Sequence, residues 1–360
     1  MFRKVVYDNI VFSLQKFGGI SNYWNEMALR LSNDSDFDAF FIERRNHNIY
    51  SALSKSGANR VIKESPELPI FLNRFMNPRL SLIDSKFVFH SSYNRYSLSK
   101  NARNITTIHD LNHFKYYRGA RRYIHNFQKK YALDNSEAII AISENTRRDL
   151  LNYFSSVSPD KVTVIYNGVS DEFEVINSDV YVYELNFDLI NRPYILWVSG
   201  REAYKNFDFA VELIARLPEF KFYIVGGTLT HHEMIKLNRY IPGRWLLFTG
   251  ITSKVLNELY NHAHALLYPS SSEGFGIPIL EAMKAGCPFV ALNSSSIPEV
   301  AGKAGVLMNE LNIEEFSFAI ENIDSSRINL VNLGLHQASK FSWDKCYMET
   351  KAIYKKLLMD

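Results

Sequence analysis

Two glutamates flank a glycine-rich stretch in the second half of the chain, in the sequence Glu273-Gly-Phe-Gly-Ile-Pro-Ile-Leu-Glu281. Ionised carboxylates only accept hydrogen bonds, and each can accept from two adjacent hydroxyl groups, which suits them to hold a sugar. Gly274 and Gly276 allow a ligand to approach the main chain closely. A helix that begins behind them would offer free N–H groups and a positive dipole end. The stretch therefore indicates a nucleotide-sugar site.

The residues around this stretch predict the elements that hold it. The run 265–270 is apolar up to Pro269, which predicts a buried parallel strand and then a loop over 270–276. Pro278 suits the first turn of a helix, and Gly286 suits its end. The two glutamates could instead lie on a solvated helix without a function, so their interpretation depends on context.

The spacing of the two glutamates around Gly-Phe-Gly resembles the donor-site motif of the retaining glycosyltransferases of family 4, which have the GT-B fold. The resemblance implies that Glu273 contacts hydroxyl groups of the transferred hexose and that Glu281 holds the ribose hydroxyls. It further implies that the main chain between them supports the sugar, through Gly274, Phe275, Gly276 and Ile277.

Short apolar runs alternate with longer amphipathic segments along the chain, a pattern typical of parallel sheets wrapped by helices. The first set of predicted strands comprises 4–7, 39–42, 87–90, 105–108, 138–142 and 162–166. The second set comprises 194–198, 222–225, 246–249, 265–268, 288–292 and 305–308. The fold class is therefore α/β, with two Rossmann-like domains that face a cleft, as in the GT-B fold.

The two sets of strands define the predicted domains. Residues 1–170 form an amino-terminal acceptor domain, and 193–342 form a carboxyl-terminal donor domain for the nucleotide sugar. Residues 171–192 are acidic and show neither helical nor strand periodicity, so they are predicted to be a linker. The segment 343–360 looks helical, and the resemblance implies that it crosses back to the first domain.

Composition agrees with a two-domain enzyme. A chain of 360 residues with 46% hydrophobic residues can form two full cores. A net charge of +3 argues against a nucleic-acid-binding protein, which would show a concentrated basic face. The two cysteines, Cys287 and Cys346, lack metal-ligand spacing, so we expect reduced thiols in a cytoplasmic protein. No apolar run is long enough to span a bilayer.

Ligands of open parallel sheets bind beyond the carboxyl ends of the strands. In the first domain, Gly18 and Gly19 follow the first strand and precede an amphipathic helix, and such a pair can bring main-chain N–H groups to a phosphate. His109 follows the fourth strand, with Asp110 placed to hold its tautomer. The resemblance places His109 near the anomeric carbon and the donor phosphate. A structural histidine is the alternative.

The loop after the fifth strand adds weaker candidates. Ser143 suits the N-cap of a helix, and the family has a similar Ser-x-x-Thr segment, so Ser143, Thr146 and Arg147 are further predicted contacts. The turn Asn167-Gly-Val169 also resembles the family, and we assign no chemistry to it.

In the second domain, cations follow the first strand. Departure of a diphosphate builds negative charge, which needs positive groups beside it. Arg201 can clamp phosphate oxygens in a fork and Lys205 can act as a point charge, so the pair could replace a metal ion. Gly200-Arg201, three residues, Lys205-Asn206 matches the family's phosphate motif, and Ile251 is expected to border the base.

Asp34-Ser-Asp36 has the Asp-x-Asp form that binds a metal in the other large structural class of glycosyltransferases, GT-A. It follows a helix and lies among other polar residues, so we interpret it as a solvated turn. We therefore predict no metal and no cofactor besides the nucleoside diphosphate sugar as co-substrate.

The segment 113–130 carries six Lys and Arg residues and no acidic residue, interleaved with aromatic residues. Basic heads with aromatic bodies suit an anionic membrane surface. The alternative is a solvated helix with an aromatic core face. From its place in the acceptor-side domain we hypothesise a lipid-diphosphate-linked oligosaccharide acceptor and a peripheral contact with the inner face of the cell membrane.

These inferences combine into a retaining glycosyltransferase that moves a hexose to a glycan or lipid-linked acceptor. The predicted catalytic residues are Glu273, His109, Arg201 and Lys205. The 204–207 and 295–299 segments most resemble bacterial mannosyltransferases of O-antigen and surface-polysaccharide assembly, which favours GDP-mannose. GDP-fucose or another GDP-deoxyhexose, or a UDP-sugar, are alternative donors. A nucleotide-sugar epimerase and a silent donor-binding subunit are alternatives of other classes.

Overall fold

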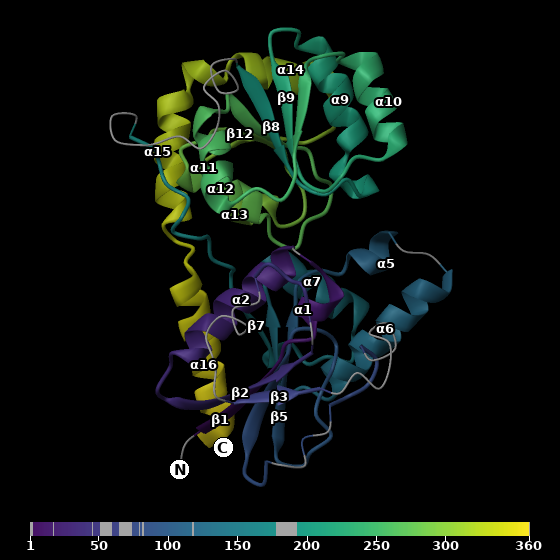
Figure 1. Ribbon diagram of the computed structural model, residues 1–360, viewed down its shortest axis with the longest axis vertical. Helices are drawn as coiled ribbons and strands as arrows, with labels where there is room; N and C mark the ends of the chain where they lie inside the picture. Colours follow the sequence, from purple (N-terminus) through teal and green to yellow (C-terminus); the bar gives the residue numbers. More distant parts are fainter. Residues whose placement is uncertain are drawn as a thin grey trace. The chain divides into compact units, whose positions relative to one another are not determined.

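The computed structural model describes residues 3–16, 18–44, 46–50, 60–64, 74–78, 80, 83–116, 119–177 and 193–359. The chain divides into two compact units. The first unit comprises Met1–Gly168 and Trp343–Asp360, and the second comprises Val169–Ser342. Each unit is built around one parallel sheet (Figure 1).

The sheet of the first unit has the strand order β3-β2-β1-β4-β5-β6-β7. Its strands are β1 Arg3–Asp8, β2 Phe37–Glu43, β3 Val61–Lys63, β4 Phe87–Ser91, β5 Ala102–Ile108, β6 Ala138–Ala141 and β7 Val162–Val164. Sequence periodicity predicts all of them except β3, because three residues are too few to show alternation. The central strands are buried on both faces, as their apolar runs predict.

The helices of the first unit are α1 Val11–Leu14, α2 Gly19–Ser32, α5 Asn112–Tyr116, α6 Gly119–Asp134, α7 Glu144–Tyr153 and α16 Trp343–Met359. The apolar stripe of α2 packs inward. Its Trp24 is fully buried, stacks on Tyr7 of β1 at 4.7 Å between ring centroids, and donates its indole N–H to Asn9 Oδ1 at 2.8 Å. This contact satisfies the one polar group that burial of a tryptophan hides from water.

The predicted helix at the carboxyl terminus is α16, and it packs within the first unit. Tyr354 on its inner face hydrogen-bonds to Tyr7 of β1 at 2.7 Å and to His90 of β4 at 2.6 Å. At its surface, Lys351 pairs with Asp34 at 2.6 Å and with Asp36 at 2.8 Å. The two aspartates lie in the loop before β2, as predicted, and they bind the lysines of the terminal helix.

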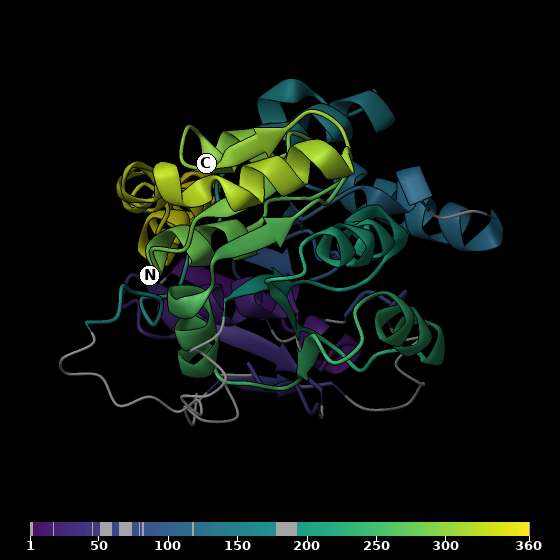
Figure 2. The same ribbon diagram turned by 90° about the horizontal axis from the view of Figure 1, so that it is seen from above.

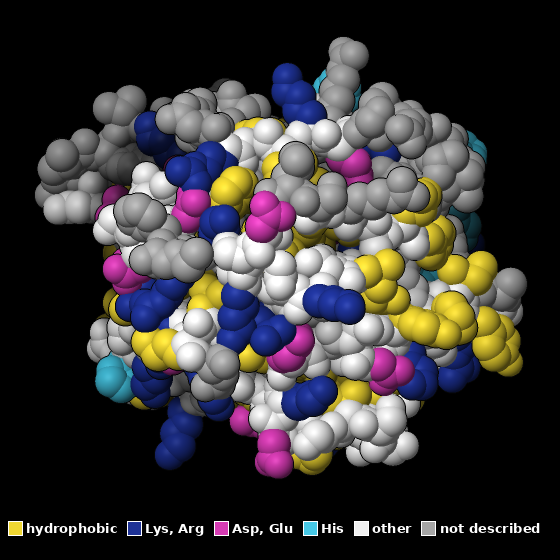
Figure 3. Space-filling view, turned by 90° about the horizontal axis from the view of Figure 1, so that it is seen from below, with side chains coloured by type: hydrophobic (Ala, Val, Ile, Leu, Met, Phe, Trp, Pro, Cys, Tyr) yellow, Lys and Arg dark blue, Asp and Glu magenta, His cyan; other side chains and the backbone are white. Residues whose placement is uncertain are grey.

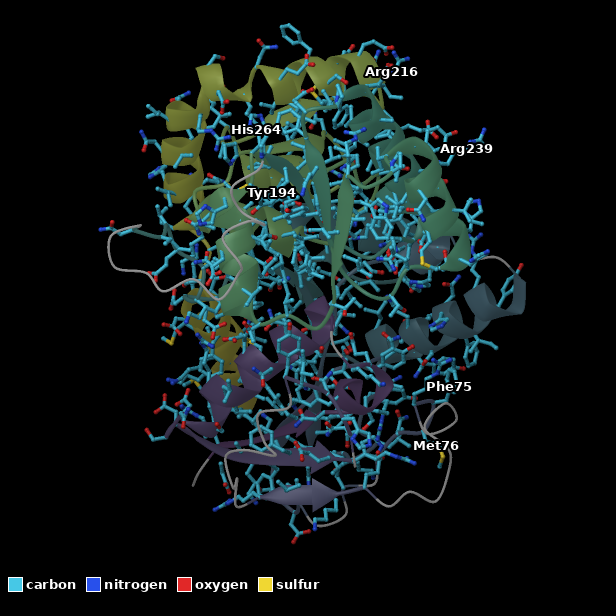
Figure 4. All side chains as sticks on the ribbon, turned by 45° about the horizontal axis from the view of Figure 1, so that its top comes forward. Phe75, Met76, Tyr194, Arg216, Arg239 and His264 are labelled. Carbon is cyan, nitrogen blue, oxygen red and sulfur yellow. The ribbon has the colours of Figure 1, made fainter. Side chains whose placement is uncertain are left out.

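The sheet of the second unit has the order β10-β9-β8-β11-β12-β13. Its strands are β8 Tyr194–Val198, β9 Lys221–Val225, β10 Trp245–Phe248, β11 Ala265–Tyr268, β12 Phe289–Leu292 and β13 Val306–Met308. All six lie within one residue of the predicted segments. Tyr194 stacks on Tyr223 inside the unit at 4.1 Å, whereas Arg216 and Arg239 project from outer helices (Figure 4).

Helices cover both faces of this second sheet (Figure 2). They are α9 Phe207–Arg216, α10 His231–Tyr240, α11 Ser253–His262, α12 Ile277–Lys284, α13 Ile297–Ala301, α14 Ile313–Glu321 and α15 Arg327–Ala338. On one face α9 packs against α10 and α14, and on the other α12 packs against α11, α13 and α15. A continuous apolar core lies between α9, α14 and the strands.

Of the predicted linker, residues 178–192 lie outside the described part of the chain. The described beginning packs on the second unit. The main-chain N–H of Glu174 donates to Asn257 Oδ1 at 3.1 Å, and that of Ile176 donates to Asn261 Oδ1 at 2.8 Å. Side chains of α11 therefore fix this extended segment.

Candidate active site

The loop that carries Glu273 connects β11 to α12, as the sequence predicts. Gly276 adopts a φ of 106° at the N-cap of α12, a conformation that a side chain would strain, and Pro278 lies in the first turn. Gly286 follows the helix with a φ of 70°. Phe275 is buried against Phe341, with 5.8 Å between the rings. This packing fixes the loop on the body of the second unit.

The carboxylate of Glu273 is held by Lys205. The Lys205 ammonium donates to both carboxylate oxygens, at 2.7 Å and 2.9 Å, and both side chains are largely buried. Two serines after β12 hold the main chain of the same loop. Ser295 Oγ accepts the N–H of Glu273 at 2.8 Å, and Ser296 Oγ donates to the carbonyls of Glu273 and Phe275.

Lys205 ends a short 3₁₀ turn, Ala203–Lys205, between β8 and α9. The next residue, Asn206, has a left-handed φ of 59°. Its amide donates to the carbonyl of Pro269 and to Ser271 Oγ, each at 2.7 Å. The Asn206 amide therefore connects the loop after β8 to the loop after β11 by hydrogen bonds, and this connection brings Lys205 close to Glu273.

Arg201 lies in the same β8–α9 loop and is held by the loop after β9. Its Nε pairs with Glu233 at 3.0 Å, and its Nη2 donates to the carbonyls of Gly227 and Thr228 at 3.0 Å and 2.6 Å. Its Nη1 is buried without a hydrogen-bond partner among the described residues. This Nη1 group is thus a buried, unsatisfied donor of the kind that can bind phosphate oxygens.

Gly226 is the residue that permits this approach. A Cβ atom at position 226 would lie 2.7 Å from the carbonyl of Ser199 and 3.2 Å from Arg201 Nη1. The glycine is thus required where the loops after β8 and β9 pass each other. Gly200 has a smaller constraint, because only the flexible Glu202 carboxylate approaches it.

Glu281 lies on α12 and accepts a hydrogen bond from Tyr260 of α11 at 2.9 Å. The side chain is partly accessible, but its carboxylate is surrounded densely enough that desolvation raises its pKa to about 7. The hydrogen bond from Tyr260 acts in the opposite direction and is the smaller effect. Glu281 therefore titrates near neutral pH, unlike an ordinary surface glutamate.

The remaining predicted donor residue, Ile251, follows β10. Gly250 before it has a φ of 63°, and Thr252 after it caps α11 by accepting the N–H of Val255 at 3.2 Å. In this unit the structure therefore places every predicted donor residue at the carboxyl edge of one sheet. Which of these residues contact a ligand remains a prediction.

His109 lies at the carboxyl edge of the first unit's sheet, directly after β5. Its ring meets Tyr23 of α2 edge-on, with 4.8 Å between centroids. Burial lowers its pKa to about 4, so the imidazole is neutral at pH 7. Asp110 does not hold the ring as predicted. Its carboxylate instead accepts the N–H of Asn112 at 3.1 Å, since an aspartate at a helix start caps the local main chain more readily.

The loop after β6 confirms the predicted N-cap. Ser143 Oγ accepts the N–H of Thr146 at 3.0 Å and donates to the Thr146 hydroxyl at 2.9 Å. Both side chains are buried, whereas Arg147 is half-exposed and lies 3.8 Å from Glu144. Gly18 and Gly19 begin α2, where a Cβ at position 18 would lie 2.2 Å from the Gln15 side chain.

Several residues that shape the carboxyl edge of the second unit's sheet, here called the donor edge, were not predicted. They are Gly226, Glu233, Tyr260, Ser295 and Ser296. Two of them had a readable signal. A glycine pair directly after a predicted strand marks a close approach, and Thr230-x-x-Glu233 forms a capping box at the start of α10. Ser295 and Ser296 lie in the 295–299 segment that resembles the family, but no role was predicted for them. Tyr260 had no such signal, because it acts on a residue distant in the sequence.

The described residues contain no group of three His, Cys, Asp or Glu side chains that could hold a metal ion. None of the described helices is both long and apolar enough to cross a membrane. Cys287 and Cys346 are free and buried, and burial raises the pKa of the Cys287 thiol to about 12, which makes it a poor nucleophile.

Models of two protein families match this architecture, one for each unit. The model described as "Glycosyltransferase Family 4" matches residues 17–173, and the model described as "Glycosyl transferases group 1" matches residues 192–325. The first unit thus carries a glycosyltransferase family 4 domain and the second a group 1 glycosyltransferase domain. The chain is an enzyme that transfers glycosyl groups, with two Rossmann-like units of the GT-B type.

Curated relatives of this glycosyltransferase include two that are named mannosyltransferases. The O-antigen chain mannosyltransferase B of Escherichia coli is 28% identical over 302 residues, which covers 79% of each chain. The serotype-specific mannosyltransferase WbdA of Escherichia coli is 26% identical over 333 residues. That match covers 86% of the glycosyltransferase described here but only 40% of the longer WbdA.

Solved structures share the fold at lower identity. Anabaena HepE in complex with UDP and glucose superposes with a TM-score of 0.74 and 13% sequence identity, over 98% of this chain and all of HepE. At this identity the likeness concerns the fold alone. It agrees with the two parallel-sheet units of the glycosyltransferase.

Proposed function

We propose that this glycosyltransferase transfers mannose from GDP-mannose to a hydroxyl of a lipid-linked oligosaccharide, with retention of the anomeric configuration, in O-antigen or other surface-polysaccharide assembly. The observation that carries the proposal is the donor edge of the second unit. There Glu273 and Glu281 lie on one loop–helix segment, Lys205 binds Glu273, and Arg201 lies in the same loop as Lys205. The mannosyltransferase names of the Escherichia coli relatives support the choice of sugar.

In this reaction the bond between the anomeric carbon and the diphosphate oxygen breaks, and the acceptor oxygen bonds to the same face of the carbon. The acceptor hydroxyl proton passes to the departing diphosphate, so that GDP leaves. Lys205 and the unsatisfied Nη1 of Arg201 stabilise the charge that builds on the diphosphate. The neutral His109 donates a hydrogen bond near the reacting centre without adding a charge.

Glu273 orients the hexose in this proposal. Its carboxylate binds Lys205 through both oxygens, which favours a hydrogen-bonding role over nucleophilic attack. Glu281 takes the ribose hydroxyls in its ionised form. Its partner Tyr260 fixes the carboxylate in one rotamer before the nucleotide binds.

The proposal includes no metal ion. Lys205 and Arg201 supply the positive charge at the leaving group, and Asp34 and Asp36 are engaged by Lys351. Transfer is expected to persist unchanged after prolonged dialysis against a chelator. A loss of transfer that added magnesium restores would refute this part of the proposal.

The proposal also includes a peripheral contact with the inner face of the cell membrane. Within the predicted membrane segment, residues 117 and 118 lie outside the described part of the chain, as do the side chains of 120 and 121. On α6, four large apolar side chains are exposed: Tyr123 at 75%, Phe127 at 64%, Ile124 at 49% and Tyr131 at 45%. Hydrophobic side chains gather on the side where α6 lies (Figure 3).

A neighbouring segment extends this aromatic surface. Gln128 of α6 donates to the carbonyl of Arg74 at 2.5 Å, and the next residues, Phe75 and Met76, project outward (Figure 4). Both are exposed, at 38% and 48%. The surface is flanked by Arg122 and Lys130, which are exposed cations. Exposed aromatic side chains beside cations suit an anionic bilayer interface.

The donor is tested by thermal stabilisation of the purified protein with a panel of GDP-, UDP- and TDP-sugars, together with acceptor-dependent turnover. Selective stabilisation by GDP-mannose that Glu281→Ala abolishes, with sugar transfer only when acceptor is present, is the expected result. Selective stabilisation by another sugar nucleotide would identify that sugar, and not mannose, as the one transferred. Turnover without acceptor would indicate an epimerase, and binding without any turnover would indicate a silent subunit.

The membrane contact is tested separately by flotation with phosphatidylglycerol vesicles. Phe127→Ser should reduce the bound fraction, by about tenfold in partition coefficient for the loss of one inserted aromatic side chain. Phe318→Ser is the matched control, because Phe318 is exposed to a similar degree, 68%, on α14 of the second unit. Equal flotation of the two variants and the unaltered protein would refute the contact.

A further inference from the structure

The helix α6 buries Ala132 and Leu133 and exposes Arg122 and Lys130 as an ordinary surface helix does, but part of it has the opposite polarity. Its outward face carries the aromatic residues described above. Its inward face carries Lys129, which is only 8% exposed, and His125, which lies one helical turn before it. A helix normally buries its apolar stripe and exposes its cations. The buried Lys129 on the inner face of α6 therefore needs an explanation of its own.

Lys129 is buried and has no carboxylate partner among the residues that the structure describes. Its ammonium group has three N–H donors, and the structure gives it one hydrogen bond, to the main-chain carbonyl of Asp110 at 2.9 Å. The Asp110 carboxylate is nearby but binds the N–H of Asn112. Burial lowers the pKa of Lys129 to about 8, so it remains mostly protonated at pH 7. Its other two N–H donors have no acceptor among the described residues.

His113 of α5 presents a second unsatisfied group to the same place. Its side chain is only 8% exposed, and its Nε2 has no hydrogen-bond partner among the described residues. Its ring lies 6.0 Å from that of His125, whose Nδ1 is 3.3 Å from the Tyr93 hydroxyl. The charged groups that act on His113 are Lys129, His125 and Arg122, and all of them are basic.

The acidic residues around this cluster are engaged elsewhere. Asp149 of α7 pairs with Lys115 at 2.7 Å, and Asp134 at the end of α6 pairs with Lys130. A buried cation and a buried unsatisfied imidazole each cost free energy unless a partner arrives. An anion with several acceptor oxygens would satisfy both at once. The cluster adjoins the loop of His109, so it lies at the carboxyl edge of the first sheet.

We propose that Lys129, His113 and His125 form a binding site for a phosphoryl group, and that this group is the one that joins lipid to glycan in the acceptor. Lysine and imidazole N–H groups from two helices can surround a tetrahedral anion. The outward face of α6 would contact the bilayer while its inward face holds the phosphoryl group of a lipid in that bilayer. The identity of the acceptor rests on the proposed function, whereas the anion site does not.

The site is tested by titrating the full chain with inorganic pyrophosphate and following the imidazole signals of His113 and His125 by NMR, assigned with His113→Gln and His125→Gln. Both signals should move saturably. Lys129→Met should weaken this binding at least tenfold. Lys130→Met is the matched control, since it removes one exposed cation from the next position of the same helix, and it should leave the binding unchanged.

Signals that stay in place at about 10 mM pyrophosphate, far above the concentration that even a weak site needs, would overturn the proposal. Equal effects of Lys129→Met and Lys130→Met would also overturn it. If Lys129→Met fails to fold, the titration of the unaltered protein decides. Movement with phosphatidylglycerol vesicles but not with pyrophosphate would assign the site to a lipid headgroup phosphate.

Transfer assays separate this site from the proposed function. With a phosphorylated acceptor, Lys129→Met should raise the acceptor KM at least tenfold and leave the donor KM unchanged. With the same glycan lacking phosphate, Lys129→Met and the unaltered enzyme should behave alike. Pyrophosphate binding in a protein that transfers no sugar would refute the proposed acceptor while leaving the anion site intact.

Discussion

The carboxyl edges of the two sheets differ in how their charged side chains are paired. At the edge of the second unit each cation has an acidic partner: Lys205 binds Glu273 and Arg201 binds Glu233. At the edge of the first unit, Lys129 binds a carbonyl, and the imidazoles of the half-buried His109 and the buried His113 are neutral at pH 7. Both cations of the second edge thus have a carboxylate partner, although Arg201 Nη1 remains an unsatisfied donor, whereas Lys129 at the first edge has no carboxylate partner among the described residues.

This difference has a consequence for ligand binding. A sugar nucleotide that binds at the second edge must replace an existing ion pair with its own contacts. Part of its binding free energy therefore only compensates for the lost ion pair. An anion at the first edge meets donors that have no such partner. We expect ligand binding at the second edge to depend on the geometry that hydrogen bonds between the loops maintain. We expect ligand binding at the first edge to depend on the burial of its donors.

The largest expected effect is at the second edge. Glu273→Gln keeps the shape of the side chain but removes the charge that holds Lys205 and the hexose, and it should lower kcat/KM for transfer by about 10³-fold. It should also destabilise the protein by roughly 3 kcal/mol, because Lys205 loses its partner in a largely buried place. Steady-state kinetics and denaturant unfolding measure the two effects.

Glu310→Gln is the control for this variant, since Glu310 is an exposed glutamate that follows another strand of the same sheet. It should leave both quantities unchanged. A Glu273→Gln enzyme with nearly full activity would remove Glu273 from the proposed chemistry and would leave its pair with Lys205 as a structural contact.

The two units should respond to acid in opposite directions. Burial lowers the pKa of His90 to about 3, of His109 to about 4 and of His113 to about 3, all in the first unit. The unfolded chain then binds more protons than the folded one below pH 6.5, so the stability of the first unit falls as pH falls from 6.5 towards 4. At pH 5 each histidine should cost about 2 kcal/mol.

Hydrogen exchange at pH 7 and pH 5 measures this response unit by unit. Protection of β4 and β5 should fall at pH 5 more than protection of β8 and β11. His90→Gln should reduce the difference, because glutamine binds no proton. Equal loss of protection in both units would show that these histidines titrate normally.

Glu281 gives the second unit the opposite trend. Its folded pKa of about 7 is higher than the 4.5 of an ordinary glutamate, so the folded state binds more protons between these values. Stability should therefore fall as pH rises from 4.5 to 7, by about 3 kcal/mol at most. Glu281→Gln should be more stable than the unaltered protein at pH 8 and should lack this dependence.

The same titration predicts donor affinity. Ribose hydroxyls donate to an ionised carboxylate, so the nucleotide Kd should weaken by about tenfold from pH 8 to pH 6, one pH unit below the folded pKa. Calorimetric titration with GDP measures it. The Kd of Glu281→Gln should be weaker and flat over this range, and a flat Kd in the unaltered protein would place Glu281 outside the nucleotide site.

The smallest expected effect is at the surface of the first unit. Asp34→Asn removes an ion pair with Lys351 and weakens a hydrogen bond from Tyr347 at 2.8 Å. Because Lys351 keeps a second partner, Asp36 at 2.8 Å, losing the Asp34 pair should weaken the docking of α16 by only about 1 kcal/mol. Denaturant unfolding with and without high salt measures it, and transfer activity should be unaffected. A loss of transfer activity in this variant would favour a metal-binding role for the Asp-x-Asp motif, which we have rejected.

Much of the fold could be predicted because parallel strands buried on both faces leave uninterrupted apolar runs. β8 and β11 match their predicted bounds residue for residue. β3 was missed because Val61–Lys63 is too short to show a period. The loop geometry around Glu273 was predictable because glycine and proline mark local conformations directly.

The partners of the site residues were less predictable. Asp110 was expected to hold His109, and it caps the start of α5 instead, because adjacency in sequence does not make two side chains meet. Tyr260 and Ser295 hold Glu281 and the main chain of Glu273 from other elements. The sequence showed that α6 is rich in basic and aromatic residues, but it did not show that Lys129 faces inward while the aromatic residues face outward.

The sequence by itself determined which residue types stand at the ends of the strands, because strand, loop and helix starts follow from local composition. It also determined the family, since the glutamate and cation motifs lie within short stretches. Only the tertiary structure decided which charges are paired and which are buried alone. Burial and pairing depend on the packing of loops that are far apart in the chain, and desolvation sets the pKa values of Glu281, His109 and Lys129.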